Sequence, residues 1–193
     1  MILPIVSYGH SILRQKCRVI DRRYPELNNL IDDMWNTLYA ANGCGLAAPQ
    51  VNHTIRLFIV DSIETFEKME EEDRDAFFDG DSGIRETFIN AKIIGKSDDV
   101  WVEKEGCLSI PTLTEEVERP WSIEIEYYDR NFMKHTAMFN GTTARMIQHE
   151  YDHTEGKLYL DYVKPLTKRL LNGKLTKISK GEIKAKYKMR FLK

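Results

Sequence analysis

Residues 149–153 read His-Glu-Tyr-Asp-His, which sets two imidazoles four positions apart with a carboxylate directly after the first. On a helix, residues four apart lie on one face, so His149 and His153 can bind the same cation while Glu150 stands beside it. Two neutral imidazole nitrogens, an open position that holds water and a carboxylate that accepts the water's proton are the parts of a hydrolytic metal site. The pattern therefore predicts a divalent metal ion at His149 and His153.

The third protein ligand distinguishes between classes of metal site. In the long metzincin signature it would be a histidine at position 159, where this chain has Tyr159. A downstream glutamate, as in thermolysin-like proteases, has few possible positions, because only forty residues follow the motif and Glu182 lies in a basic segment. The segment Glu105-Gly-Cys-Leu-Ser109 offers the thiol of Cys107 beside a glycine. Other upstream candidates, in less suitable surroundings, are Cys17, Cys44, His10, His53 and His135.

A further segment, Gly43-Cys-Gly-Leu-Ala-Ala-Pro-Gln50, has glycines that let a backbone approach a ligand closely and alanines that allow tight packing. It fits neither G-x-G-x-x-G nor G-x-x-x-x-G-K, so it is not a phosphate-binding loop. Taken in chain order, this segment, residues 105–109 and Gln148-His-Glu-Tyr-Asp-His153 resemble the three signature motifs of the peptide deformylase family. The resemblance covers most of residues 1–162.

The resemblance implies that Cys107, His149 and His153 bind the metal, with water as the fourth ligand. The family's metal in cells is usually Fe²⁺, and Zn²⁺, Ni²⁺ or Co²⁺ often replaces it. One thiolate and two imidazoles suit several of these ions, so the residues alone do not choose between them. The reaction it implies is hydrolysis of the formyl group of formyl-methionine on nascent polypeptides, in which a metal-bound hydroxide attacks the formyl carbonyl and formate is released.

The resemblance also assigns the remaining site residues. Glu150 corresponds to the general acid/base, while the Gln50 side chain and the backbone N–H of Leu108 correspond to the groups that stabilise the oxyanion. Arg145 departs from the family, because many members carry an aliphatic residue there; its stem can wall the methionine slot while its head reaches a carboxylate. Glu105 is expected to pair with Arg119. The predicted substrate-binding residues are Gly43, Cys44, Gly45, Arg145 and Met146.

The composition and charge of the chain limit which classes of protein it can belong to. The chain has 193 residues, 42% of them hydrophobic, and a formal charge of −2, which is ordinary for one globular domain. No apolar run exceeds four residues, far below a membrane span, and residues 1–7 lack the features of a secretory signal. Three cysteines without a C-x-x-C pair favour a reducing compartment. Together with the formylated substrate that the resemblance implies, this leads us to expect the bacterial cytoplasm.

Charge is distributed unevenly along the chain. Residues 61–86 carry eleven acids and three bases, and the segment reads as a solvated insertion. Residues 164–193 carry eleven bases and one acid, a pattern that fits either a solvated face or a surface that binds RNA. Two alternative functions remain at this stage: a zinc peptidase, and a non-catalytic ribosome- or RNA-binding protein that uses the basic tail. We expect nascent formylated chains as partners, possible ribosome contact, and neither membrane nor DNA.

Hydrophobic periodicity places these motifs on structural elements. Expected helices are 25–41, 141–154 and 166–178. Expected strands are 57–60, 87–90 and 99–103, a hairpin of 121–128 with 131–139, and a lysine-rich C-terminal edge strand over 183–191 packed through Tyr187, Met189 and Phe191. Together with the resemblance they predict an α+β fold, a single domain over 1–193 with antiparallel and mixed sheets around a central buried helix that carries the His-Glu-x-x-His motif. The basic extension is 164–193.

Overall fold

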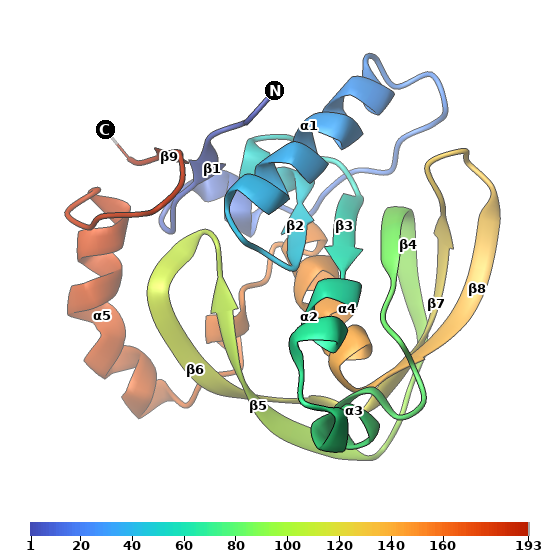
Figure 1. Ribbon diagram of the computed structural model, residues 1–193. Helices are drawn as coiled ribbons and strands as arrows, with labels where there is room; N and C mark the ends of the chain where they lie inside the picture. Colours follow the sequence, from blue (N-terminus) through green and yellow to red (C-terminus); the bar gives the residue numbers. More distant parts are fainter. Residues whose placement is uncertain (193) are drawn as a thin grey trace.

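The computed structural model describes residues 1–192 (Figure 1). The strands are β1 Ile5–Val6, β2 Gly45–Ala47, β3 Leu57–Asp61, β4 Arg85–Lys96, β5 Val100–Cys107, β6 Ile110–Pro120, β7 Ser122–Tyr128, β8 Lys134–Asn140 and β9 Met189–Arg190. The helices are α1 Leu27–Ala40, α2 Ile63–Lys68, α3 Glu71–Phe78, α4 Gly141–Thr154 and α5 Pro165–Ser179. Three short 3₁₀ turns occupy Ser11–Arg14, Ala48–Val51 and Tyr159–Asp161.

The strands form three sheets. β2, β3, β4, β7 and β8 make a five-stranded sheet in that order, with every neighbouring pair antiparallel. β5 and β6 form a long antiparallel hairpin of their own, and β9 pairs in parallel with β1. With helices packed against these sheets, the predicted α+β class with antiparallel sheets is confirmed, while the parallel pair β1–β9 forms a separate sheet.

Strand β3 shows why α4 lies at the centre. Leu57 and Ile59 point into the cluster packed by α1, whereas Phe58 and Val60 point into the cluster that contains Ala144 and Ile147 of α4. Successive strand residues face opposite sides of a sheet, so a run buried throughout means that both faces are covered. The helix that carries the motif is thus packed against the sheet (Figure 1).

The periodic elements lie where the sequence predicts them. Helix α1 ends shortly before Gly43, α4 runs from Gly141 to Thr154, and β7 and β8 form the expected hairpin. Strand β4 is much longer than the predicted strand 87–90. The sequence did not indicate its second half, because that half is largely exposed and lacks an apolar alternation. Similarly β5 extends past 103 to Cys107. No helix among residues 1–192 is both long and apolar enough to cross a membrane.

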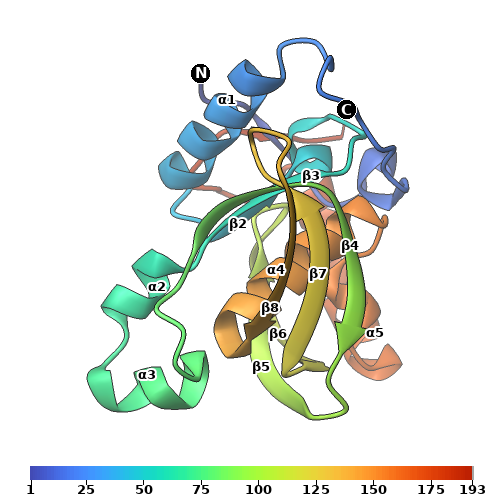
Figure 2. The same cartoon turned by 90° about the vertical axis from the view of Figure 1, so that its right-hand side faces the viewer.

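The two charged segments behave differently. The acidic insertion forms α2 and α3, which project from one side of the molecule and bury only Phe78 between them (Figure 2). In the basic tail α5 buries Leu171, Leu175 and Ile178, while Leu166 and Leu170 are exposed. After α5 the predicted edge strand is reduced to Met189–Arg190, because only this short stretch pairs with β1. Burial nevertheless alternates from residue 183 to 190, with each lysine exposed.

Candidate metal centre

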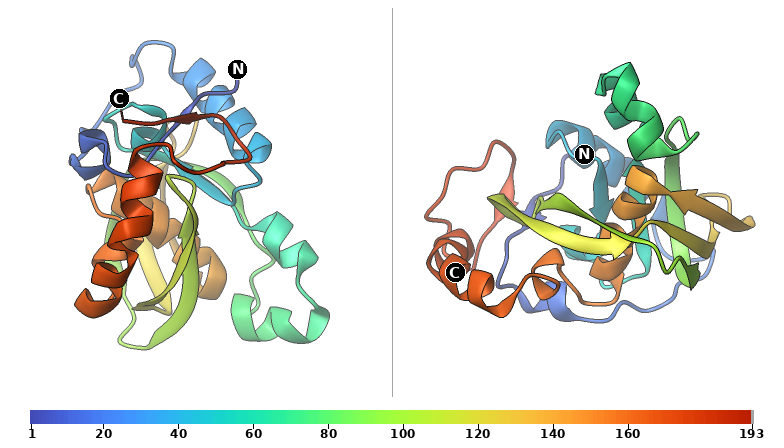
Figure 3. Two further views of the ribbon diagram at one scale, coloured as in Figure 1. Left: turned by 90° about the vertical axis from the view of Figure 1, so that its left-hand side faces the viewer. Right: turned by 90° about the horizontal axis from the view of Figure 1, so that it is seen from below.

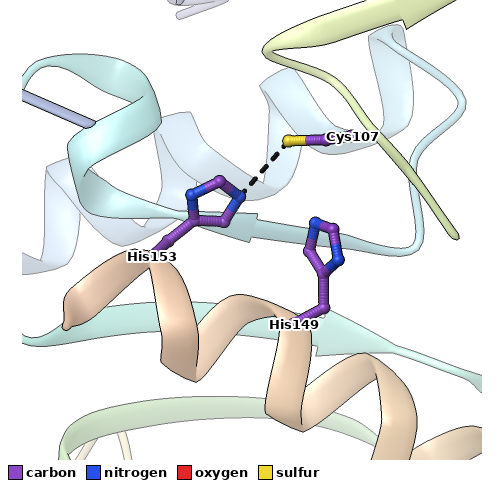
Figure 4. Close-up of side chains that lie close together, drawn as sticks. All are labelled: Cys107, His149 and His153. Atoms are coloured by element: carbon purple, nitrogen blue, oxygen red, sulfur yellow. Dashed lines mark hydrogen bonds between the residues drawn. The ribbon is translucent and has the colours of Figure 1, made fainter. Parts of the chain in front are cut away.

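Helix α4 and the end of β5 bring three ligand atoms together. His149 and His153 project from one face of α4, and Cys107 faces them from the last position of β5 (Figure 4). One ligand atom from each residue lies within 4.8 Å of the others, and the Cys107 Sγ is 3.3 Å from the His153 Nε2. A thiolate and two imidazoles at this spacing fit a divalent transition metal ion.

The alternative ligands do not join this group. Among residues 1–192 the only cluster of three potential ligands is Cys107, His149 and His153. Cys17 is buried near Thr154, where burial raises the pKa of its thiol to about 11. His135 pairs with Asp129 at 3.1 Å. The thiol next to the glycine therefore lies beside the two histidines of α4, whereas Cys44 borders the same cavity but adds no ligand atom to the cluster.

The carboxylate of Glu105 fixes the orientation of the His149 imidazole. Its Oε2 lies 2.9 Å from the Nδ1 of His149. An ionised carboxylate only accepts, so Nδ1 carries the proton and Nε2 is left to bind a cation. The predicted partner Arg119 donates two hydrogen bonds to Glu105, at 2.6 and 2.9 Å, and a third to Asp152 at 2.8 Å. Burial favours a higher pKa for Glu105, but the bonds from His149 and Arg119 hold it well below its usual range.

Arg145 also reaches Glu105. Its guanidinium donates to Glu105 Oε1 at 2.7 Å, to the Val117 carbonyl at 3.0 Å and to the Trp101 carbonyl at 2.8 Å. The same group lies 4.2 Å from the Trp101 ring centroid. The carboxylate expected for its head is therefore Glu105, and the side chain ties α4 to the β5–β6 hairpin while it borders the cavity described below.

Glu150 is buried beside the two histidines. Only 5% of its surface is exposed, and its Oε2 has no hydrogen-bond partner among the described residues. Burial raises the pKa of Glu150 to about 7, and the charge of Glu105 adds to this, while His149 opposes it. Gly45 of β2 lies directly against it, since a Cβ there would be 2.6 Å from the Glu150 Oε1. A glycine is needed at this position to leave room for the carboxylate.

Gln50 presents an amide N–H₂ to the same centre. The N–H of Ala47 donates to Gln50 Oε1 at 2.8 Å, which fixes the oxygen end of the side chain. The nitrogen end then points at Cys107 Sγ, 3.5 Å away, and at Ser109 Oγ, 3.3 Å away. Because Gln50 is almost completely buried, this orientation is held without competition from solvent.

A cavity of about 1050 Å³ opens onto these groups. All five residues predicted to bind substrate border it: Gly43, Cys44, Gly45, Arg145 and Met146. Two regions that the sequence analysis did not assign to the site border it as well, namely Met69 and Phe77 of the acidic insertion and residues 184–187 of the basic tail. The alternation in the tail predicted which side chains turn inward, but no signal indicated which element they would meet.

A buried carboxyl and a Cys-His-His cluster on an α+β scaffold define a metal-dependent hydrolase. A sequence model of polypeptide deformylases matches residues 2–169. The chain belongs to the polypeptide deformylase family, which confirms the resemblance drawn from the three motifs.

Known peptide deformylases match this chain over almost its whole length. The chain is 47% identical to the peptide deformylase of Christiangramia forsetii, over 99% of this chain and 96% of that protein. Identity to the peptide deformylase of Flavobacterium psychrophilum is 44%, over 100% and 98% of the two chains. The crystal structure of peptide deformylase from Ehrlichia chaffeensis superposes with a TM-score of 0.81 at 29% identity, covering 94% of this chain and 99% of that one. The protein is therefore an enzyme of this class rather than a non-catalytic binding protein.

Proposed function

We propose that this chain hydrolyses the N-formyl group of formyl-methionine at the start of nascent polypeptides and releases formate. The observation that carries the proposal is the convergence of Cys107, His149 and His153 beside the buried carboxyl of Glu150, in a chain of this family. Formate release from formyl-Met-Ala tests it. A zinc peptidase would instead cleave a blocked peptide at an internal bond, so both substrates are assayed side by side.

The catalytic roles follow from the chemistry of the side chains. Cys107, His149 and His153 would hold a divalent ion, which would supply Lewis-acid activation of water for attack on an amide carbonyl. Glu150, buried beside these ligands, would accept a proton from the attacking water and pass it to the leaving amine. A general acid/base is most effective when its pKa lies near the working pH, and burial raises the pKa of Glu150 to about 7.

Negative charge develops on the former formyl oxygen, and two donors are proposed to receive it. These are the Nε2 of Gln50, which the Ala47 N–H holds in place, and the backbone N–H of Leu108. Donors fixed before the reaction stabilise such charge more than mobile water does.

Replacing Gln50 by alanine is expected to lower kcat about 10²–10³-fold, or about 3–4 kcal/mol, because one fixed donor is lost. Steady-state formate release and metal content are measured together. Gln50→Glu keeps the oxygen that accepts from Ala47 but lacks the donor, so it should lose activity to a similar degree. If Gln50→Glu retained wild-type kcat, the donor role would be wrong.

We further propose that the methionine side chain enters the cavity between Cys44, Gly45 and Met146. The stem of Arg145 forms part of its wall, and its head is engaged with Glu105. The resident ion in cells is proposed to be Fe²⁺, with Zn²⁺, Ni²⁺ or Co²⁺ able to replace it, since the donor set accepts all of them. Metal analysis of protein purified without oxygen tests this identity.

The partners and compartment are proposed in the same way. We infer a bacterial cytoplasmic enzyme that acts on chains leaving the ribosome, built as one catalytic domain over residues 1–193 with the basic extension 164–193. Exposed Arg169, Lys174 and Lys177 on α5 support contact with ribosomal RNA.

Reversing Lys174 and Lys177 to glutamate is expected to weaken co-sedimentation with ribosomes, most clearly at low salt, while hydrolysis of formyl-Met-Ala is unchanged. Each lost phosphate contact reduces the salt dependence of binding. The matched control replaces two exposed acids of the acidic insertion, Glu71 and Glu72, by lysine. Equal co-sedimentation of the wild type and the lysine variant would argue against this surface.

A further inference from the structure

We propose that the C-terminal segment 184–187 is part of the catalytic site, and that Tyr187 is a positioning residue for the turn that carries Cys107 and Leu108. The inference deepens the proposed function and rests on it. The sequence model of the family ends its match at residue 169, so the match itself assigns no role to this segment.

The direct contact is a hydrogen bond from the tail to the turn. The phenol of Tyr187 donates to the backbone carbonyl of Leu108 at 2.7 Å. On the next residue, the carbonyl of Ser109 accepts from the backbone N–H of Tyr8 at 2.8 Å. The tail and the N-terminal strand region therefore hold the backbone of the turn between β5 and β6 from outside the hairpin, in addition to the contact of the Gln50 side chain with Ser109.

The tail is itself anchored next to this contact. The N–H of Ile5 donates to the Lys188 carbonyl at 2.9 Å, and the N–H of Ser7 donates to the Arg190 carbonyl at 2.9 Å. Figure 3 shows the chain leaving α5 and returning beside β1. The ring of Tyr187 is half-buried against the core cluster that includes α1. A phenol held by both its ring and its neighbouring backbone can fix the position of the group that it binds.

The same segment borders the catalytic cavity. Residues 184–187 line it together with Cys107, Leu108 and Glu150. Lys184 and Lys186 are exposed, whereas Tyr187 turns inward, as expected from the alternation of an extended chain. The tail therefore contributes a wall to the cavity and a bond to the turn at its edge.

A bond to the Leu108 carbonyl holds the peptide plane between Leu108 and Ser109, and it thereby limits rotation about the Leu108 Cα, which joins this plane to the one that carries the Leu108 N–H. The N–H of Leu108 is one of the two proposed oxyanion donors, and its adjacent residue Cys107 is a proposed metal ligand. Preorganised donors are effective only when they are held close to the position of the developing charge. Loss of the Tyr187 phenol should therefore reduce kcat and leave KM nearly unchanged, because the ground-state substrate does not use this alignment.

The test compares full-length Tyr187→Phe with wild type, both loaded with one metal ion per chain. Phenylalanine keeps the ring and removes only the hydroxyl. We expect kcat for formyl-Met-Ala to fall about 5–20-fold with KM within twofold, and backbone hydrogen exchange to rise at residues 107–110 alone. Such a loss lies below the 10²–10³-fold effect of deleting a donor outright, since the donor is misaligned and not removed.

Tyr128→Phe is the matched control. Tyr128 is also half-buried against the same core cluster, but it lies outside the cavity lining. It should leave kcat, KM and exchange at residues 107–110 unchanged. Unchanged kcat and unchanged local exchange in Tyr187→Phe would overturn the inference, and so would a uniform rise in exchange throughout the protein. Wild-type protein that releases no formate would refute the proposed function instead, and the exchange measurement would still decide whether Tyr187 holds the turn.

Discussion

Glu150→Ala is expected to bind one metal ion per chain and to lose about 10²–10⁴-fold in kcat, the usual range for removal of a positioned general acid/base. The side chain is not among the three clustered ligand atoms, so metal binding should survive. Among the described residues, the Oε2 of the buried Glu150 has no hydrogen-bond partner. The two other buried carboxylates near the imidazoles, Glu105 and Asp152, are both paired with Arg119. No neighbouring carboxylate can therefore take over the proton transfer.

Two further variants make the Glu150 result specific. Glu150→Gln preserves the size of the side chain but cannot carry the proton, so it should lose as much activity as alanine. Glu118→Ala removes an exposed carboxylate on β6 and should behave as wild type. Near-normal kcat in either Glu150 variant with its metal intact would refute the assigned role.

Cys107→Ala is expected to lose both the metal and the activity. The variant leaves only the two imidazoles of the cluster of three ligand atoms. A thiolate ligand also releases its proton on binding, so metal uptake by the wild type should weaken as the pH falls. Metal content after dialysis, measured by elemental analysis, should fall well below one ion per chain.

Cys17→Ala separates this effect from the loss of any buried thiol. Cys17 is as buried as Cys107 but lies apart from the histidines, so its variant should keep the metal and turnover even if its melting temperature is lower. Stoichiometric metal and wild-type formate release in Cys107→Ala would mean that the ion is held by other groups.

The catalytic motifs could be predicted because their chemistry is encoded locally. Spacing on one helix puts His149 and His153 on a common face whatever surrounds them, and the glycines at 43 and 45 mark a close approach of backbone to other groups. The structure supplies the reason for Gly45, since Glu150 fills the space that a Cβ would take. The resemblance predicts the pairing of Glu105 with Arg119, which the structure shows. In addition, Arg145 donates a hydrogen bond to the same carboxylate.

The parts that sequence reasoning missed depend on contacts between distant segments. Alternation in the tail showed that Tyr187 turns inward, but periodicity does not identify the neighbour, which is Leu108. The charge of the acidic insertion predicts a solvated segment, and most of its side chains are exposed, yet Phe77 borders the cavity. The predicted edge strand 183–191 is longer than the observed β9, Met189–Arg190. Alternating burial needs only an extended chain, whereas strand pairing also needs a partner, and the partner β1 is only two residues long.

The most direct test of the metal-dependent deformylase account is formate release from formyl-Met-Ala by wild-type protein that is prepared without oxygen and loaded with one Fe²⁺ per chain. The account predicts rapid stoichiometric release of formate and free Met-Ala, loss of activity when a chelator removes the ion, and recovery when Fe²⁺ or Ni²⁺ is returned. Formate release that is unaffected by removal of the ion, or its complete absence in the loaded protein, would contradict it.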